Sequence, residues 1–435
     1  MLVKWMVSIT VLLMASVAQA GPVIQAWKTD EGAQVVFVQS KELPMVDLKV
    51  LFAAGSSRDG ALPGLSGMVS GLLETGAGDL NANQIALAFE EVGAQMSSSS
   101  SMDYSAVVLR SLSEHTKLDQ AVRHLVLLLT KPTFPAEDLE RERSRALIGL
   151  QYAAQSPDAI GTKAFLKAIY GTHPYGSPPD GTEASLKAMQ RDDLIAFHRQ
   201  YFVASNATIA MVGDVTLEQA KALAQKITAA MPRGQQAKSL AAVMPLAKAE
   251  QITLNHPSSQ SHLMMGHPGV TRKDPDYMPI YLGNFILGGS GLTSRLSDEI
   301  REKRGLSYSV SSFFMPLEQS GPFEVSLQTS NEQMKLALQV ATETLAKFRD
   351  VGPTEAEIVS AKKNITGGFP LRIDSNKDIL EYLSVIGFYH LPLDYLDTFS
   401  ARIEQVTSAQ IKDAFVRRLY PDKMVRVIVG DTAKQ

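Results

Sequence analysis

The second half of this sequence repeats the order of the first, and the repeat restricts the fold more than any other feature. The string IAMVGD ends at Asp214 and the string RVIVGD ends at Asp431, an offset of 431 − 214 = 217 residues. The strings EEVGAQMS and EKRGLSYS, residues 90–97 and 302–309, correspond at a similar offset. A repeat of this length indicates two copies of one domain that arose by an ancient duplication.

Each half mixes strand-like and helix-like segments. Apolar residues at every second position of residues 46–52 alternate with Asp47 and Lys49, which predicts a strand with one buried face. Paired strands are expected over residues 94–112, followed by helices and a closing strand. This order predicts an α+β fold, in which each half has helices packed on one face of a mainly antiparallel sheet.

The repeat also sets the expected domain boundaries. We predict one domain over residues 21–231 and a second over residues 251–435, joined by a linker over residues 232–250 that contains Gly, Gln, Lys and Ala. In the second domain, helices are expected over residues 277–287 and 292–303, and strands over residues 307–314 and 323–329.

The first twenty residues have the pattern of a cleaved secretory signal peptide. Lys4 precedes an apolar run from Met6 to Val17, and the segment ends in the small-x-small string Ala18-Gln19-Ala20. The run is too short to span a bilayer, although an uncleaved anchor is the alternative. The mature chain is therefore predicted to be periplasmic or secreted, without a stable membrane anchor.

Composition excludes several functional classes. The net charge of −3 and the interspersed charged residues leave no basic stripe, so nucleic acid is not expected as a partner. The chain has no cysteine, which excludes a thiol enzyme and a lipid-anchored lipoprotein. Among the eight histidines, His262 and His267 lie five residues apart with no acidic residue before Asp274, which is not the spacing of a metal site.

Residues 288–308, GGSGLTSRLSDEIREKRGLSY, form the stretch of greatest functional interest. A glycine cluster, a short amphipathic helix and a second glycine turn lead into a strand that opens with a tyrosine. This arrangement projects Arg301 and Tyr308 from a fixed scaffold. From the spacing alone, a surface arginine near Asp298 and a packed tyrosine explain the pair without any function.

Over its whole mature length the chain resembles the pitrilysin or insulinase-type metallopeptidases, in the two-subunit branch that includes mitochondrial processing peptidase. The duplication carries this resemblance, together with GSSRDGALPGLSGMVSGLLETG, PTFPAEDLERER, GTHPYG and, most specifically, ILGGSGLTSRLSDEIREKRGLSYSV. Members that cut peptides hold zinc with H-x-x-E-H. Here the matching positions are Gly67, Ser70 and Gly71, and the region of the third ligand, a glutamate, reads LIGL over residues 147–150. Glycine and leucine have no donor atom, so no metal site is expected in this chain.

The resemblance implies a role for Arg301 and Tyr308. In the family, an arginine and a tyrosine with this spacing reach across a clamshell to the zinc half, contact the substrate backbone and stabilise the oxyanion. We therefore expect the non-zinc subunit of a heterodimeric exported zinc metallopeptidase, inactive alone and acting on an extended peptide bound to a sheet edge. This chain is expected to hold no cofactor, and zinc is expected in a homologous partner that bears H-x-x-E-H.

Two alternatives remain open. A catalytically inactive peptide-binding or scaffolding homologue would keep the fold but would have no reason to keep Arg301 and Tyr308 in register. A self-sufficient hydrolase with a different metal site is the other alternative, and the scattered histidines offer it little support.

Overall fold

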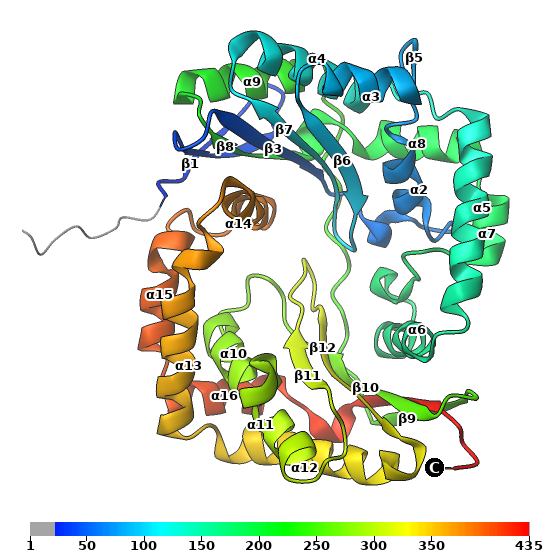
Figure 1. Cartoon of the computed structure of the whole chain (residues 1–435), viewed down its shortest axis with the longest axis vertical. Helices are drawn as coiled ribbons and strands as arrows, with labels where there is room; N and C mark the ends of the chain where they lie inside the picture. The colour runs from blue at the N-terminus through cyan, green and yellow to red at the C-terminus, as the bar shows by residue number, and fades with distance from the viewer. Residues whose placement is uncertain (1–21, 435) are drawn as a thin grey trace, which may run out of the picture.

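The computed structural model describes residues 22–434, which form two layered halves (Figure 1). The predicted signal peptide, residues 1–20, lies outside the described residues. Within residues 22–434, no helix is both long enough and apolar enough to cross a lipid bilayer. Each half combines one sheet with several helices, which confirms the predicted α+β class.

The first half is built on a six-stranded sheet. All neighbouring strands in it are antiparallel except the second and third in spatial order, which run parallel. In that order the strands are β1 (Gln25–Lys28), β2 (Gln34–Gln39), β8 (Ala207–Gly213), β3 (Met45–Phe52), β7 (Ser105–Leu112) and β6 (Gln95–Ser100). A short ribbon, β4 (Gly76–Ala77) and β5 (Leu80–Asn81), lies outside this sheet. The helices are α2 (Leu65–Leu72), α3 (Ala82–Glu90), α4 (His115–Thr130), α5 (Ala136–Ala153), α6 (Pro157–Tyr170), α7 (Glu183–Ala188), α8 (Arg191–Tyr201) and α9 (Leu217–Ala229).

The second half is built on a five-stranded sheet. In spatial order its strands are β9 (Glu250–Asn255), β13 (Val425–Gly430), β10 (Gln260–Pro268), β12 (Pro322–Ser330) and β11 (Val310–Phe314). Only β9 and β13 run parallel. The helices are α10 (Tyr277–Asn284), α11 (Arg295–Ser297), α12 (Met334–Val351), α13 (Glu355–Gly368), α14 (Asn376–Phe388), α15 (Tyr395–Gln405) and α16 (Ser408–Arg418).

The two sheets have the same topology. If β2 is matched with β9, then β8, β3, β7 and β6 match β13, β10, β12 and β11 in order, and the single parallel pair falls at the same place. The strand β1 has no counterpart. The agreement supports the duplication inferred from the repeated sequence strings, because two unrelated domains would not share strand order and direction.

Each half buries its own apolar core between its sheet and the helices on the outer side of that sheet (Figure 1). In the first half, the alternating residues Val46, Leu48, Val50 and Phe52 all enter this core, as the period-two pattern predicts. In the second half, Phe323, Val325 and Leu327 of β12 occupy the equivalent core with residues of α12 and α16. Burial of these apolar side chains is the main source of stability for each layer.

The face of each sheet that is turned toward the other half is covered by a helix from that other half. Helix α14 packs Ile379, Leu380 and Leu383 against β2 and β8 of the first sheet. Helix α6 packs Phe165 and Ile169 against β10 and β13 of the second sheet. Figure 1 shows both helices lying between the two sheets. The halves therefore exchange one helix each, which joins them into one body.

This exchange corrects one prediction from the sequence. The pattern of residues 46–52 predicts that Asp47 and Lys49 lie on an exposed face, but both are buried. The reason is that α14 covers this face, so that Lys49 donates to Glu381 of α14 at 2.8 Å, while Asp47 accepts from Arg110 of β7 at 2.6 Å. Each buried charge is thereby paired, as burial in a protein interior requires.

The predicted linker, residues 232–250, has no regular structure before β9. It is nevertheless packed, because Leu240, Val243 and Leu246 lie against the apolar cluster beneath α6. The backbone amide of Leu240 also donates to Glu318 at 3.1 Å. The domain boundaries proposed from the sequence remain a prediction. The helices α6 and α14 each pack against the sheet of the other half.

Candidate functional site

The three positions that match the zinc motif all lie on α2. The loop before this helix is held by Asp59, whose carboxylate accepts from the backbone amides of Gly64 at 2.7 Å and Ser66 at 2.8 Å. Burial raises the pKa of Asp59 to about 6, although these hydrogen bonds act in the opposite direction. The carboxylate fixes the start of α2, and with it the places of Gly67, Ser70 and Gly71.

The space for metal ligands on α2 is present, but the donor atoms are not. A Cβ atom added at Gly71 would meet nothing within 4 Å, and one at Gly67 would meet only the carbonyl oxygen of Pro179 at 3.9 Å. On α5, which packs beside α2, an added Cβ atom at Gly149 would also meet nothing within 4 Å. What distinguishes this surface from a zinc site is therefore the residue types and not a steric block.

Ser70, the one polar residue among the three, makes hydrogen bonds within the fold. Its hydroxyl lies 3.3 Å from both the carbonyl oxygen of Ser99 and the hydroxyl of Ser105, while Ser98 donates to the Ser70 carbonyl at 2.7 Å. These bonds tie α2 to the edge strand β6. Across residues 22–434, no group of three or more His, Cys, Asp or Glu side chains could hold a metal ion. The residues present on α2 and α5 do not fit zinc.

The segment that carries Arg301 is not the single helix expected over residues 292–303. It consists of a 3-10 turn at Gly291–Thr293, the short helix α11 and a π-helical turn at Asp298–Glu302. Ser294 causes the break, because its backbone is extended and its hydroxyl accepts from the amide of Ser297 as a cap. A π-helical turn widens the backbone locally, and such turns are frequent at functional sites.

A partly buried ion pair anchors this segment to α13. Arg295 makes two bonds to Glu357, with Nε to Oε1 at 2.5 Å and Nη2 to Oε2 at 2.6 Å, and its guanidinium lies 5.0 Å from the ring centre of Phe348. Burial acts to raise the pKa of Glu357, but the hydrogen bonds from Arg295 and Thr354 outweigh it and lower the pKa to about 2. A two-pronged contact of this kind fixes orientation as well as position.

Arg301 has no comparable two-pronged ion pair among the described residues. Its side chain is one-third exposed, and within residues 22–434 its only ion pair is with the neighbouring Glu302, at 3.6 Å from Nε to Oε1. By contrast, Arg304 in the same segment is bound to Glu299 at 2.6 Å. A guanidinium without a firm partner is available for a ligand, since it gives up little on binding one.

Tyr308 lies outside the strand that it was expected to open. The strand β11 begins at Val310. In the turn before it, the Ser307 hydroxyl lies 2.7 Å from each of two carbonyl oxygens, those of Ser309 and Gln328. These local bonds replace strand pairing at Tyr308. The side chain is 86% exposed, and its hydroxyl has no hydrogen-bond partner in the described part of the chain.

The structure does not bring all the predicted site residues together. Arg301 and Tyr308 flank one turn at the edge of the second sheet, whereas Gly67, Ser70 and Gly71 lie on α2 in the first half (Figure 1). Among the described residues, α2 packs mainly against α5, α8, β6 and β7, all of which belong to the first half. The pair therefore does not complete a site with the degenerate zinc motif of its own chain.

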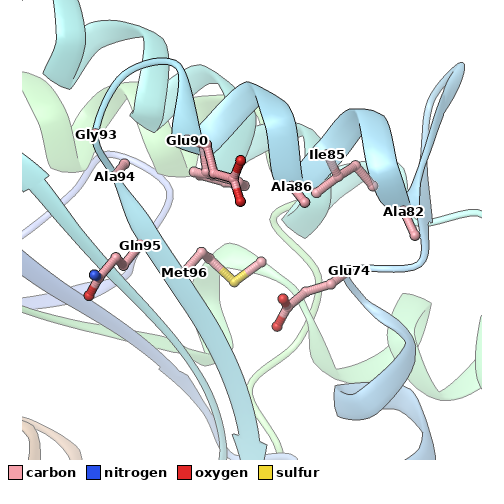
Figure 2. A pocket seen from close by; sticks show the side chains of 10 residues that line it. Glu74, Ala82, Ile85, Ala86, Glu90, Gly93, Ala94, Gln95 and Met96 are labelled. Atoms are coloured by element: carbon pink, nitrogen blue, oxygen red, sulfur yellow. The ribbon is translucent and has the colours of Figure 1, made fainter.

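Sequence reasoning missed a groove between α3 and the edge strand β6. The groove has a volume of about 520 Å³. Figure 2 shows Glu90 of α3 and Glu74 entering it from different sides, with Met96 of β6 nearby. Ile85 and Phe89 add apolar surface from α3. The string EEVGAQMS contains two of the lining residues, Glu90 and Met96, and is the sequence signal that could have located the groove.

Comparison with known protein families gives two matches that together span most of the chain. Residues 34–183 match the family model described as Insulinase (Peptidase family M16), and residues 188–365 match the model described as Peptidase M16 inactive domain. The boundary between the two matches falls before the predicted linker.

Solved structures and curated relatives give a consistent result. The crystal structure of a peptidase M16 inactive domain from Pseudomonas fluorescens is 39% identical, covers 95% of this chain and 98% of its own, and has a TM-score of 0.92. The Bacillus subtilis protein described as uncharacterized zinc protease YmxG is 25% identical over 81% of this chain and 85% of its own length. The Helicobacter pylori protein described as non-peptidase homolog YmxG is 24% identical over 92% of each chain.

Proposed function

This chain belongs to the M16 or insulinase family of peptidases, and we propose that it acts as the non-zinc subunit of a two-chain peptidase. In this proposal, a homologous partner bears H-x-x-E-H and zinc, and the present chain is inactive alone. The observation that carries the proposal is the combination of two features of the described chain: α2 has glycines at two of the motif positions, and Arg301 and Tyr308 have no firm internal partner. Relatives described as inactive or non-peptidase support it.

The proposed contribution of this chain is electrostatic. The guanidinium of Arg301 is a permanent cation with several donors, and the phenol of Tyr308 is a rigid neutral donor. Both would donate to the backbone of a peptide and to the carbonyl oxygen that gains negative charge when the peptide bond is attacked in the partner's site. The anchored Arg295 and the bonded Ser307 hold the two ends of this segment in place.

Substitution of the pair in the reconstituted two-chain complex tests this proposal. Arg301→Ala and Tyr308→Phe are each expected to lower kcat/KM for an unstructured peptide by about a hundredfold, the usual effect of removing one oxyanion donor. Both side chains are at the surface, so we expect neither change to affect folding.

Matched controls are available in the same chain. Arg304→Ala removes a neighbouring cation that is bound to Glu299, and Tyr201→Phe removes a phenol hydroxyl from α8 in the other half. Neither control is expected to lower the rate more than about twofold, in line with surface substitutions that touch no site. Full activity of both Arg301→Ala and Tyr308→Phe complexes would rule out a direct role for the pair.

A peptide-binding or scaffolding role without catalysis is the second candidate. The groove of about 520 Å³ between α3 and β6 favours it, because this groove belongs to the present chain alone. Under this alternative, the zinc-bearing homologue would be equally active with and without this chain. Retention of peptide binding by the isolated chain, together with no change in cleavage, would support it.

We also propose that the protein is exported and works in the periplasm or outside the cell. The support is the signal-like pattern of residues 1–20. N-terminal sequencing of the mature protein is expected to begin at Gly21, and a retained Met1 would contradict export by this route.

A further inference from the structure

We propose that Asn284 is a positioning residue, which acts by fixing Arg301 relative to Tyr308. This inference rests on the proposed function of that pair, and it adds the part of the fold that sets their geometry. Its basis is two hydrogen bonds between Asn284 and Ser312, which join the support of Arg301 to the support of Tyr308.

Arg301 and Tyr308 are carried by different elements. Arg301 lies in the π-helical turn that follows α11, and Tyr308 lies two residues before β11. The chain between them passes through an exposed turn at Gly305, where φ is +60°. Figure 1 shows α11 close to β11, and the two elements are in contact. The distance between the two side chains therefore depends on how α11 sits against β11.

A tightly packed glycine lies at the contact between α11 and β11. Gly288 is buried in the π-helical turn Phe285–Gly289, which follows α10. A Cβ atom added at Gly288 would come within 2.6 Å of the backbone nitrogen of Ser312 on β11 and within 2.9 Å of Cδ1 of Leu296 on α11. The backbone of Gly288 thus contacts both elements, and its place helps to decide their separation.

Asn284 fastens this glycine turn to β11. It is the last residue of α10, and its side-chain Nδ2 donates to the carbonyl oxygen of Ser312 at 3.0 Å. In return, the Ser312 hydroxyl donates to Oδ1 of Asn284 at 2.8 Å. Ser312 is buried, and its strand pairs with β12. Because both ends of the amide are bonded to one residue, the orientation of Asn284 is fixed as well as its distance from the strand.

The effect of Asn284 on the reaction would be geometric. Without these two bonds, the glycine turn and α11 can shift relative to β11, and Arg301 moves with α11. A misplacement of about 1 Å in a group that stabilises the transition state can lower the rate about a hundredfold. Tyr308 is attached to β11 itself, so its position depends less on the Asn284 bonds.

Kinetics of the reconstituted two-chain complex, with this chain in excess over the zinc-bearing homologue, test the role of Asn284. Asn284→Ala is expected to lower kcat/KM about thirtyfold, because the Arg301 cation is displaced but not removed. In a chain that already carries Arg301→Ala, the same change is expected to have less than about a twofold effect. A general structural role would give the same factor in both backgrounds, because it does not act through Arg301.

Asn206→Ala is the matched control. Asn206 also donates through Nδ2 to a backbone carbonyl oxygen, that of Tyr201 at 2.9 Å, and its Oδ1 accepts from the amide of Ala237 at 3.0 Å. It is buried in the first half, so its removal costs stability at a place remote in sequence from α11 and β11. No more than about a twofold change in kcat/KM is expected.

Ser312→Ala provides a second variant for the case that Asn284→Ala fails to fold. It deletes one hydroxyl and leaves the bond from Asn284 to the Ser312 carbonyl oxygen in place. The expected loss in kcat/KM is about threefold, and it is again expected to vanish in the Arg301→Ala background.

Hydrogen exchange in the isolated chain gives a readout that needs no partner. The amide of Gly305 donates to the carbonyl oxygen of Arg301, and the amide of Leu306 donates to that of Ile300, each at 2.9 Å. Both amides are expected to exchange about tenfold faster in Asn284→Ala and at the wild-type rate in Asn206→Ala.

The outcomes separate this inference from the proposed function. Full activity of the Arg301→Ala and Tyr308→Phe complexes would overturn the proposed function, and the positioning role with it. A large loss in Arg301→Ala, together with equal activity of the Asn284→Ala, Ser312→Ala and Asn206→Ala complexes, would overturn the positioning role alone. An equal effect of Asn284→Ala with and without Arg301 would do the same.

Discussion

At the scale of single residues, Asp103 joins the two halves. It is buried, and its carboxylate accepts from the hydroxyls of Tyr175 at 2.5 Å and Tyr389 at 2.8 Å and from the backbone amide of Glu318 at 2.7 Å. Asp103→Ala would leave these three donors, two of which are hydroxyls of buried tyrosines, without this partner. We expect a loss of about 3 kcal/mol in the free energy of unfolding, measured by urea denaturation. Asp180→Ala, at an exposed loop position, is the control and is expected to change stability by less than about 0.5 kcal/mol.

Glu324 on β12 provides a test that depends on pH. Burial, with a smaller contribution from Asp158, raises its pKa to about 7 from an ordinary value of 4.5. Between these values the folded state binds more protons than the unfolded state, so the contribution of Glu324 to stability falls as pH rises from 4.5 to 7 and then levels off. Glu324→Gln removes this effect. Relative to the wild type, the free energy of unfolding of the variant is expected to rise by on the order of 3 kcal/mol between pH 4.5 and pH 8.

The matched control for Glu324 is Glu332→Gln, at an exposed position beyond the same strand. Its stability relative to the wild type is expected to be independent of pH. The free energy of unfolding is measured by urea denaturation at each pH. A difference between Glu324→Gln and the wild type that stays constant across this range would contradict a raised pKa of Glu324 as the cause.

At the scale of helices and strands, the exchanged helix α14 is part of the first sheet's structure. Leu383 is fully buried against β2 and β8, although it belongs to the second half of the sequence. Leu383→Ala is expected to lower the free energy of unfolding by about 3 kcal/mol, because it leaves a cavity in a packed layer. Hydrogen exchange is expected to show faster exchange of the β2 and β8 amides. Leu393→Ala, at a position that is 43% exposed, is the control. Faster exchange confined to residues 376–388 would show that the sheet does not depend on α14.

The same scale shows how far sequence reasoning reaches. The strands at residues 46–52 and 94–112 were predicted correctly. The period-two pattern at residues 46–52 identified the strand and one buried face, but not that the opposite face is buried as well. The exchange of α6 and α14 was not predicted, since the apolar face of a helix does not reveal which sheet it meets. The segment over residues 292–303 was wrongly predicted as one helix, because apolar periodicity outweighed the capping serine at Ser294.

The sequence predicts the candidate site only in those features that depend on the type of side chain alone. The expectation that Gly67 and Gly71 bind no metal follows from the sequence, because glycine has no side-chain donor atom. The availability of Arg301 and Tyr308 needed the structure, since it rests on the absence of firm partners in the folded chain. The groove also needed the structure, because its carboxylates at Glu74 and Glu90 come from a loop and a helix that only the fold brings together.

At the scale of the whole molecule, the two copies of the domain differ in the side chains that they present at the surface. The helix exchange and the Asp103 contacts join the copies into one body. On this body, the second half presents a basic and phenolic pair, and the first half presents a degenerate zinc motif and an acidic groove. In the described chain, α2 has space for metal ligands but lacks their donor atoms, and Arg301 and Tyr308 lack firm partners. This is the basis for proposing that the site is completed by a second chain.

Cleavage of an unstructured peptide library by this chain alone, by a zinc-bearing homologue from the same source alone, and by their mixture tests the central claim most directly. The proposed function predicts activity only in the mixture, removal of that activity by a chelator, and zinc bound to the homologue but not to this chain. Stoichiometric zinc in the purified chain, or a mixture no more active than the homologue alone, would contradict it.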